Sequence, residues 1–188
     1  MRIIAGEFRG RTIEAPQGRD TRPTTDRVRE SVMSSVYSAT GGFDGLRVLD
    51  AFSGSGAMGL EAVSRGASFA LLNDGSADAR AVLERNAGSL GCLPGRAKVS
   101  SVDVLRFGLP QTGAPYDIVF LDPPYKTAQR DVLELMANGR EAGLLSDGCL
   151  IVYEHDEPID EALVEGIGMR LRSERKLGKT YVSYLSLA

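Results

Sequence analysis

Segments with the pattern of buried strands alternate with segments of helical periodicity along most of this chain, and this alternation restricts the fold more than any other feature. Strands are expected over residues 46–52, 68–73, 97–99, 116–121 and 149–154, and helices over 56–64, 76–89, 128–142 and 159–166. The last two segments, 169–176 and 180–187, have the pattern of an antiparallel hairpin. We therefore expect an α/β fold with a mostly parallel seven-stranded sheet, whose ligands bind at the carboxyl ends of the strands.

The first 40 residues precede this alternation and are expected to form an N-terminal extension, with the main domain over 41–188. Residues 2–13 have the pattern of a β-hairpin, interrupted by Gly6 and Gly10. A helix is expected to follow a cap at Thr24 or Thr25 and to end near Ala39. Its apolar side would consist of Val28, Val32, Met33 and Val36.

The composition limits the classes of protein that remain. A chain of 188 residues with 43% hydrophobic content is sufficient for one core, and it has neither an apolar run long enough to span a membrane nor a secretory signal. Its two cysteines, Cys92 and Cys149, lack metal-ligand spacing. The lone His155 excludes a multi-histidine metal site, and we interpret it as an ordinary polar residue at a strand end. We expect a cytoplasmic monomer that uses neither a membrane nor a metal.

The basic residues are concentrated near the two ends of the chain. Residues 1–29 contain seven arginines and four acidic residues, so the net charge of −3 combines a basic arm with an acidic body. Such an arm is typical of proteins that bind phosphate groups, and an ordinary solvated surface is the alternative. The residues expected to contact substrate are Arg9, Arg11, Arg22, Thr24, Arg27 and Arg29, with helix capping as the alternative for Thr24. A second basic group contains Arg170, Arg172, Arg175, Lys176 and Lys179.

Asp122-Pro123-Pro124-Tyr125 directly follows the expected strand 116–121. The Asp122 carboxylate and an adjoining carbonyl can accept the hydrogens of a planar amino group, and the Tyr125 ring offers a face on which a base can stack. A Pro-Pro pair is also common in plain surface turns. We interpret these four residues as the candidate catalytic residues of a site that clamps a flat amine.

A glycine-rich loop follows the first expected strand of the main domain. Gly54, Gly56 and Gly59 match G-x-G-x-x-G, a pattern that also occurs in nicotinamide-binding folds. Asp50, at the entrance of the loop, would repel a pyrophosphate but attract an ammonium group. S-adenosylmethionine carries an ammonium and a sulfonium but no phosphate, so the motif favours this cofactor. The loop residues expected to contact it are Asp50, Phe52, Ser53, Gly54, Ser55 and Gly56.

The ends of the next two expected strands would complete the cofactor site. Asn73 or Asp74 would bind the ribose hydroxyls. Asp103 and Val104 would hold the adenine ring, with the Asp103 carboxylate accepting from its amino group. A helix cap at Asp103 is the alternative to that role.

The two motifs together resemble those of amino-group methyltransferases, and further segments narrow the resemblance to the RsmD family. The narrower resemblance is carried by Met1-Arg2-Ile3-Ile4-Ala5-Gly6, residues 22–30 and Ser64-Arg65-Gly66-Ala67. It covers nearly the whole chain and is most specific in the N-terminal segment. It implies a Rossmann-like class I methyltransferase fold and a reaction that converts S-adenosylmethionine to S-adenosylhomocysteine. The implied target is the exocyclic N2 of guanine 966 in 16S ribosomal RNA, on the 30S subunit or its assembly intermediate. This chain departs from the family at Asn73, where glutamate is usual, and at Ser53, where alanine is common.

The residues by themselves leave the target base open. A DNA methyltransferase acting on adenine N6 or cytosine N4 would use the same clamp, and no base-selecting residue can be identified from the sequence. A cytosine C5 enzyme needs a cysteine nucleophile, and neither cysteine lies in a suitable loop. A non-catalytic nucleic-acid-binding module would not need both motifs, and Asp50 argues against a nicotinamide oxidoreductase.

Overall fold

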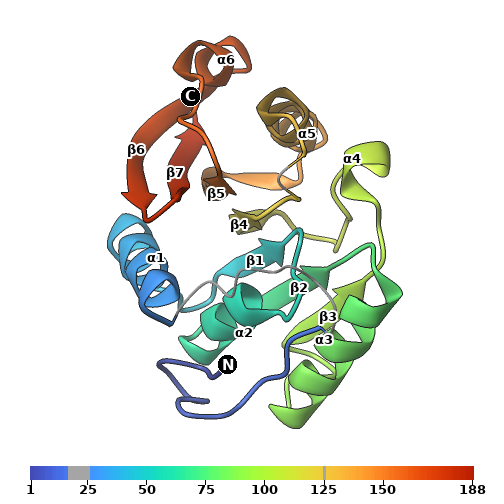
Figure 1. The fold of residues 1–188 in the computed structure, drawn as a ribbon. Helices are drawn as coiled ribbons and strands as arrows, with labels where there is room; N and C mark the ends of the chain where they lie inside the picture. The colour runs from blue at the N-terminus through green and yellow to red at the C-terminus, as the bar shows by residue number, and fades with distance from the viewer. Residues whose placement is uncertain (17–25, 125) are drawn as a thin grey trace.

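A computed structural model of the chain describes residues 1–16, 26–124 and 126–188. Its centre is a seven-stranded sheet in the order β3-β2-β1-β4-β5-β7-β6, in which β7 runs antiparallel to both of its neighbours. The strands are β1 (Arg47–Asp50), β2 (Phe69–Asn73), β3 (Ala97–Ser100), β4 (Tyr116–Leu121), β5 (Leu145–His155), β6 (Met169–Leu177) and β7 (Thr180–Leu187). The expected fold class is confirmed (Figure 1).

Two layers of helices cover the two faces of the sheet (Figure 1). One layer contains α1 (Asp26–Thr40), α2 (Ala57–Ser64) and α3 (Ala77–Ser89), and the other contains α4 (Val104–Phe107), α5 (Gln129–Glu141) and α6 (Glu161–Gly166). Successive side chains of a strand point to opposite faces, so Val48 and Phe120 pack with the first layer whereas Leu49 and Val119 pack with the second. Each face therefore has its own hydrophobic core.

The strand order creates a topological switch point between β1 and β4. From β1 the chain proceeds outward through β2 to β3 and then returns to β4, on the other side of β1. The parallel register pairs Asp50, the last residue of β1, with Phe120 near the end of β4. The glycine loop after β1 and the residues after β4 therefore lie at the same edge of the sheet, where ligands of such folds bind.

The N-terminal segment (residues 1–16) docks against α2 and forms a smaller hairpin than the sequence predicts. An isolated bridge joins Arg2 to Thr12, and Ile3 bonds across the hairpin to Gly10 and Arg11, but the segment that follows bonds mainly to α2. The N–H of Glu7 donates to the Ser64 carbonyl at 2.7 Å, and the N–H of Phe8 donates to Ser64 Oγ at 2.9 Å. Contact with α2 thus replaces cross-strand pairing over the middle of the expected hairpin.

Most expected elements recur with boundaries that differ by a few residues. β4 matches its expected range, whereas β5 begins at Leu145 instead of residue 149. The short helix α4 was expected only under the alternative interpretation of Asp103 as a helix cap. α1 begins at Asp26 and buries Val32, Met33 and Val36 as predicted, while its expected caps Thr24 and Thr25 lie outside the described residues. No helix in the described part of the chain is long and apolar enough to span a membrane. The division of the chain at residue 40 stays a prediction.

Candidate active site

The carboxyl end of β1 carries Asp50, which fixes the first turn of α2. Its side chain is 4% exposed, and Oδ2 accepts a hydrogen bond of 3.0 Å from the N–H of Gly59. Burial, together with the charges of Asp122 and Asp74, raises the pKa of Asp50 to about 7, although the Gly59 N–H bond acts to lower it. A cationic ligand beside Asp50 would stabilise the ionised form of this carboxyl group.

The three glycines of the loop serve two purposes. Gly54 and Gly56 have φ angles of 54° and 81°, in the left-handed region that favours glycine. They turn the chain from β1 into α2, and a Cβ atom on Gly56 would lie 2.8 Å from Leu83 Cδ2, so this glycine also lets the loop pack against α3. A Cβ atom on Gly59 would lie 2.3 Å from Leu72 Cδ2, so the third glycine allows α2 to pack against β2.

The other loop residues predicted to contact the cofactor lie at the same strand edge. Ser53 is buried, and its Oγ donates to the Asp50 carbonyl at 2.7 Å. Ser55 is half-buried, and its carbonyl accepts from Asn86 Nδ2 at 2.8 Å. Phe52, which directly precedes Ser53 in the chain, is half-buried. Their contact with a cofactor stays a prediction.

Asn73 and Asp74, at the end of β2, hold neighbouring loops in place. Asn73 Nδ2 donates to the carbonyls of Ala51 and Val102 at 3.0 Å each, and Asn73 Oδ1 accepts from the Val102 N–H at 3.0 Å. Asp74 Oδ2 accepts from the Gly54 N–H at 2.9 Å, which links β2 to the glycine loop. Because both amide hydrogens of Asn73 are committed to backbone carbonyls, Asp74 is the better candidate for the ribose contact.

Asp103 caps α4. Its carboxylate accepts a hydrogen bond from the N–H of Arg106, as the capping alternative predicted. Val104 is the buried first residue of this helix. A carboxylate has two oxygens and can serve more than one donor, so the expected contact of Asp103 with an adenine amine stays a prediction.

Asp122 immediately follows β4, at the edge of the sheet that also carries the glycine loop. The side chain has exposed surface, but the protein around it removes enough water to raise its pKa to about 6. Pro123 is buried and Pro124 is exposed, so the backbone after Asp122 is anchored to the protein on one side. Tyr125 lies outside the described residues, and its stacking role stays a prediction.

A carboxylate that the sequence reasoning missed, Glu154, lies on β5 beside this motif. The register pairs Leu121 with Tyr153, so the residues that follow them, Asp122 and Glu154, are neighbours across two parallel strands. Burial raises the pKa of Glu154 to about 8, and the charge of Asp122 contributes to the rise. The sequence places Glu154 at the end of an expected strand, but it does not show that this strand pairs with β4. The proximity of Glu154 to Asp122 can be inferred only once the strand order is known.

A cavity of about 250 Å³ opens between the ends of β4 and β5. It is lined on one side by residues of the clamp and the start of α5, and on the other by the end of β5. The lining residues are Pro123, Pro124, Lys126, Thr127, Ala128, Gln129, Tyr153, Glu154, His155, Asp156 and Glu157. Polar side chains predominate among them, as expected for a site that binds a polar group through hydrogen bonds.

Asp50, Asp122 and Glu154 lie at the carboxyl ends of the neighbouring strands β1, β4 and β5. Asp50 pairs with Phe120, so Asp122 lies two residues beyond the partner of Asp50. The charge of Asp122 raises the pKa of both Asp50 and Glu154. The three carboxyl groups thus lie along one edge of the sheet, between the glycine loop and the cavity.

The arginines predicted to contact substrate do not share one environment. Arg9, Arg11 and Arg27 are exposed, whereas Arg29 is 1% exposed. Arg29 Nη2 donates to the Arg2 carbonyl and to Asp26 Oδ1, so the prediction of a phosphate contact is wrong for Arg29. Arg22 and Thr24 lie outside the described residues.

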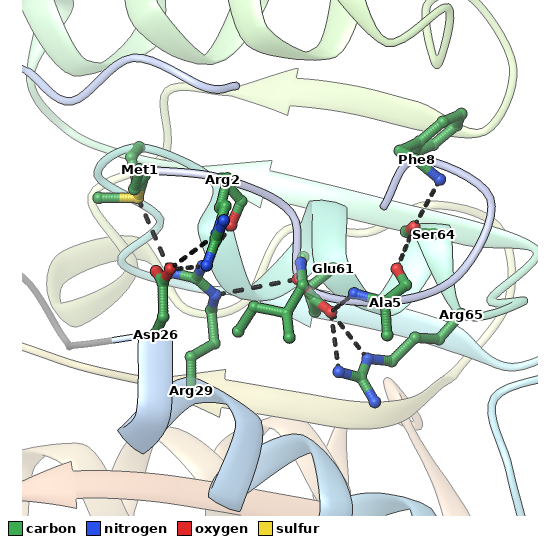
Figure 2. Close-up of polar contacts among 12 residues, drawn as sticks. Met1, Arg2, Ala5, Phe8, Asp26, Arg29, Glu61, Ser64 and Arg65 are labelled. Carbon is green, nitrogen blue, oxygen red and sulfur yellow. Dashed lines mark hydrogen bonds and ion pairs between the residues drawn. The ribbon is translucent and has the colours of Figure 1, made fainter. Parts of the chain in front are cut away.

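Arg29 belongs to a buried polar network centred on Glu61, a residue of α2 that is completely buried. The N–H groups of Ile4 and Ala5 donate to Glu61 at 2.8 and 3.0 Å. Arg65 Nε donates to Glu61 at 2.9 Å, and Arg29 Nε lies 3.9 Å from the same carboxylate. Figure 2 shows Glu61 between the two arginines and beneath the N-terminal segment. The network fastens that segment to the helix that begins at the glycine loop.

The comparisons with known proteins agree with this geometry. A family model described as conserved hypothetical protein 95 matches residues 1–186. Ribosomal RNA small subunit methyltransferase D of Escherichia coli K12 is 40% identical over 157 residues, which cover 83% of this chain and 75% of that protein. The putative rRNA methyltransferase YlbH of Bacillus subtilis is 35% identical over 170 residues, covering 89% and 88%. The structure of the putative methyltransferase yhhF from Escherichia coli superposes with a TM-score of 0.80 at 31% identity, covering 100% and 97%.

Proposed function

The chain belongs to the RsmD family, whose relatives are named as ribosomal RNA methyltransferases, and on this premise we propose that it methylates the exocyclic N2 of a guanine in 16S ribosomal RNA. The methyl donor is S-adenosylmethionine. Guanine 966, on the 30S subunit or its assembly intermediate, is the target that the family resemblance favours. The observation that carries the proposal is the position of Asp122 beside the glycine loop, since it brings an amine clamp to a cofactor site.

The residues present suit S-adenosylmethionine. Asp50 and Asp122 are carboxyl groups with raised pKa values beside the glycine loop. A bound cation would stabilise their ionised forms and so lower both pKa values. Asp50 and the loop residues 52–56 would hold the amino acid part of the cofactor, Asp74 the ribose, and Asp103 with Val104 the adenine. When bound, the cofactor supplies an electrophilic methyl group on a sulfonium sulfur.

The clamp residues would prepare the amine for attack. A guanine amino group is a poor nucleophile because its lone pair is delocalised into the ring. Asp122 and the adjoining carbonyl would accept its two hydrogens and favour a pyramidal nitrogen, with the base stacked on Tyr125. Alignment of this kind contributes on the order of several kcal/mol to the barrier. Asp122 also lies where it can accept the proton that the methylated amine loses.

The RNA would be held by basic residues near this edge and farther from it. Arg27, at the start of α1, is exposed, and Arg22 and Thr24 are proposed to act with it near this edge. Arg9 and Arg11 are exposed near the C-terminal ends of α2 and α3, where Arg11 donates to the Ser89 carbonyl, so they would contact a more distant part of the RNA. The turn between β6 and β7 lies at the same edge of the sheet, because His155 pairs with Tyr181 and Tyr181 pairs with Lys176. Lys176 Nζ lies 4.9 Å from the centre of the Tyr181 ring, so this corner offers a cation and an aromatic face to a nucleic acid.

The direct test is methylation of 30S subunits, naked ribosomal RNA and DNA with a labelled cofactor, followed by nucleoside analysis. We expect labelled N2-methylguanosine, and we expect Asp122→Ala to abolish transfer while it binds S-adenosylhomocysteine with affinity close to that of the wild type. Asp147→Asn, which removes an exposed carboxylate at the opposite end of β5, is the matched control. Label in adenine or cytosine of DNA, or full activity of Asp122→Ala, would overturn the proposal.

A further inference from the structure

The clamp by itself does not discriminate between bases, because guanine, adenine and cytosine all carry an exocyclic amine. They differ in the ring atom beside that amine. Guanine has an N–H donor there, at N1, whereas adenine N1 and cytosine N3 carry a lone pair. A residue next to Asp122 that accepts but does not donate hydrogen bonds would therefore favour guanine.

Glu154 occupies the position next to Asp122. The pairing of Leu121 with Tyr153 places Asp122 and Glu154 side by side, about one strand spacing of 4.8 Å apart. Within the described residues, no side chain donates a hydrogen bond to the Glu154 carboxylate. An unpaired, half-buried carboxylate beside an amine clamp is available to a ligand.

The cavity gives this carboxylate access to a base. Its volume of about 250 Å³ is below the roughly 300–1,000 Å³ of pockets for drug-sized ligands, which suits a single flat ring system. Glu154 lines the cavity together with Pro123 and Pro124, the residues that follow Asp122. Asp122 precedes these prolines and lies next to the cavity, outside its lining. A base that extended from the cavity to place its amine at Asp122 would present the adjacent ring atom toward Glu154.

We propose that Glu154 selects guanine by accepting the hydrogen of the ring N1 while Asp122 holds the neighbouring amine. The inference rests on the proposed function and assigns a residue to the choice of base, which the clamp leaves open. An ionised glutamate offers only acceptors, so the lone pair of adenine N1 or cytosine N3 would face a negative charge. The N1–H of a bound guanine would stabilise the carboxylate form of Glu154 against the burial and the Asp122 charge that raise its pKa to about 8.

The test compares Glu154→Gln with the wild type on two substrates. These are small-subunit ribosomal RNAs, naked or reconstituted, that carry either guanine or 2-aminopurine at the target nucleotide. 2-Aminopurine keeps the exocyclic amine but replaces the N1 hydrogen with a lone pair. We expect Glu154→Gln to lose about 10- to 100-fold in kcat/KM with guanine, the size of one hydrogen bond to a charged group. Its preference for guanine over 2-aminopurine should fall by a similar factor, because the glutamine amide can donate to a bare N1.

Two further measurements separate selection from a general loss of structure. Glu154→Asp keeps the charge and should retain the preference for guanine at a lower rate. Asp147→Asn, at the far end of β5, should behave as the wild type on both substrates, and all variants should bind S-adenosylhomocysteine alike. An unchanged guanine preference in Glu154→Gln would overturn the role of Glu154 while leaving the proposed function intact. If the wild type methylates no guanine in any RNA, the proposed function itself is refuted, and the role of Glu154 with it.

Discussion

Replacement of Glu61 by alanine would remove the carboxylate that fastens the N-terminal segment to α2. The change leaves the N–H groups of Ile4 and Ala5 without their charged acceptor, and it takes the partner at 2.9 Å from Arg65. Arg29, which is 1% exposed, would lose the Glu61 charge but keep Asp26 at 3.1 Å. Removing one partner of a buried ion pair costs about 3–5 kcal/mol. Because Arg29 retains Asp26, we expect a loss near the lower end, about 3 kcal/mol.

The assay is the free energy of unfolding from urea titration, accompanied by thermal melting. For a domain of this length, a loss of about 3 kcal/mol corresponds to a decrease in Tm of roughly 6–12 °C. The control is Glu84→Ala on α3, an exposed position, which should change the stability by less than about 0.5 kcal/mol. Amide hydrogen exchange gives a local measurement, since the Ile4 and Ala5 amides should lose their protection in Glu61→Ala.

The reasoning would be refuted if Glu61→Ala unfolds within about 1 kcal/mol of the wild type. It would also be refuted if the Ile4 and Ala5 amides stay as protected as before. Either result would mean that apolar contacts of the N-terminal segment, such as those of Ile3 and Phe8 in the core, hold it on α2 without the polar network.

Two other predictions concern the cofactor site. Gly59→Ala would place a Cβ atom 2.3 Å from Leu72 Cδ2, so denaturation should show a loss of about 1–3 kcal/mol in the free energy of unfolding. Calorimetry should show a weaker affinity for S-adenosylmethionine. The control is Gly88→Ala on α3, where the new Cβ has open space, and this change should be neutral or stabilising. Asp50 has a pKa of about 7, and a cationic ligand lowers it by favouring the carboxylate, so affinity for S-adenosylmethionine should rise with pH through about 7 and then level off. Asp122, with a pKa of about 6, contributes in the same direction at lower pH. Asp50→Asn should flatten the dependence near pH 7, and an equal slope in both proteins would show that Asp50 does not face the cation.

Features encoded within a short stretch of sequence were predictable. β4 and residues 122–125 form one continuous stretch, so the strand and the motif after it could be identified together. The glycines after β1 likewise indicate the turn that leads into α2. α4 was missed because four residues are too few to show helical periodicity, although Asp103 was identified as its possible cap. The fold class followed from the order of the elements, since repeated strand–helix units have few alternative arrangements.

Features that depend on distant residues were not predictable. Glu154 is separated from Asp122 by α5 and most of β5, and only the pairing of β4 with β5 brings them together. The sequence suggested that Arg29 is one of several surface arginines, whereas the structure places it beside the buried Glu61 of α2. The middle of the expected hairpin lost its partner strand for the same reason, because the Ile4 and Ala5 amides bind that glutamate. In each case the deciding contact joins residues that no local pattern connects.

Asn73 holds two loops of the structure together. Its amide donates to two carbonyls, and its oxygen accepts from one N–H, so a single side chain joins the loops after β1 and β3. A glutamate here, as is usual in the family, has no hydrogens to donate when ionised and would set a negative charge against the carbonyls of Ala51 and Val102. A glutamate at position 73 would therefore require both loops to rearrange. Asn73 thus acts as a joint between two loops, and Asp74 is the neighbouring residue that we propose for the ribose contact.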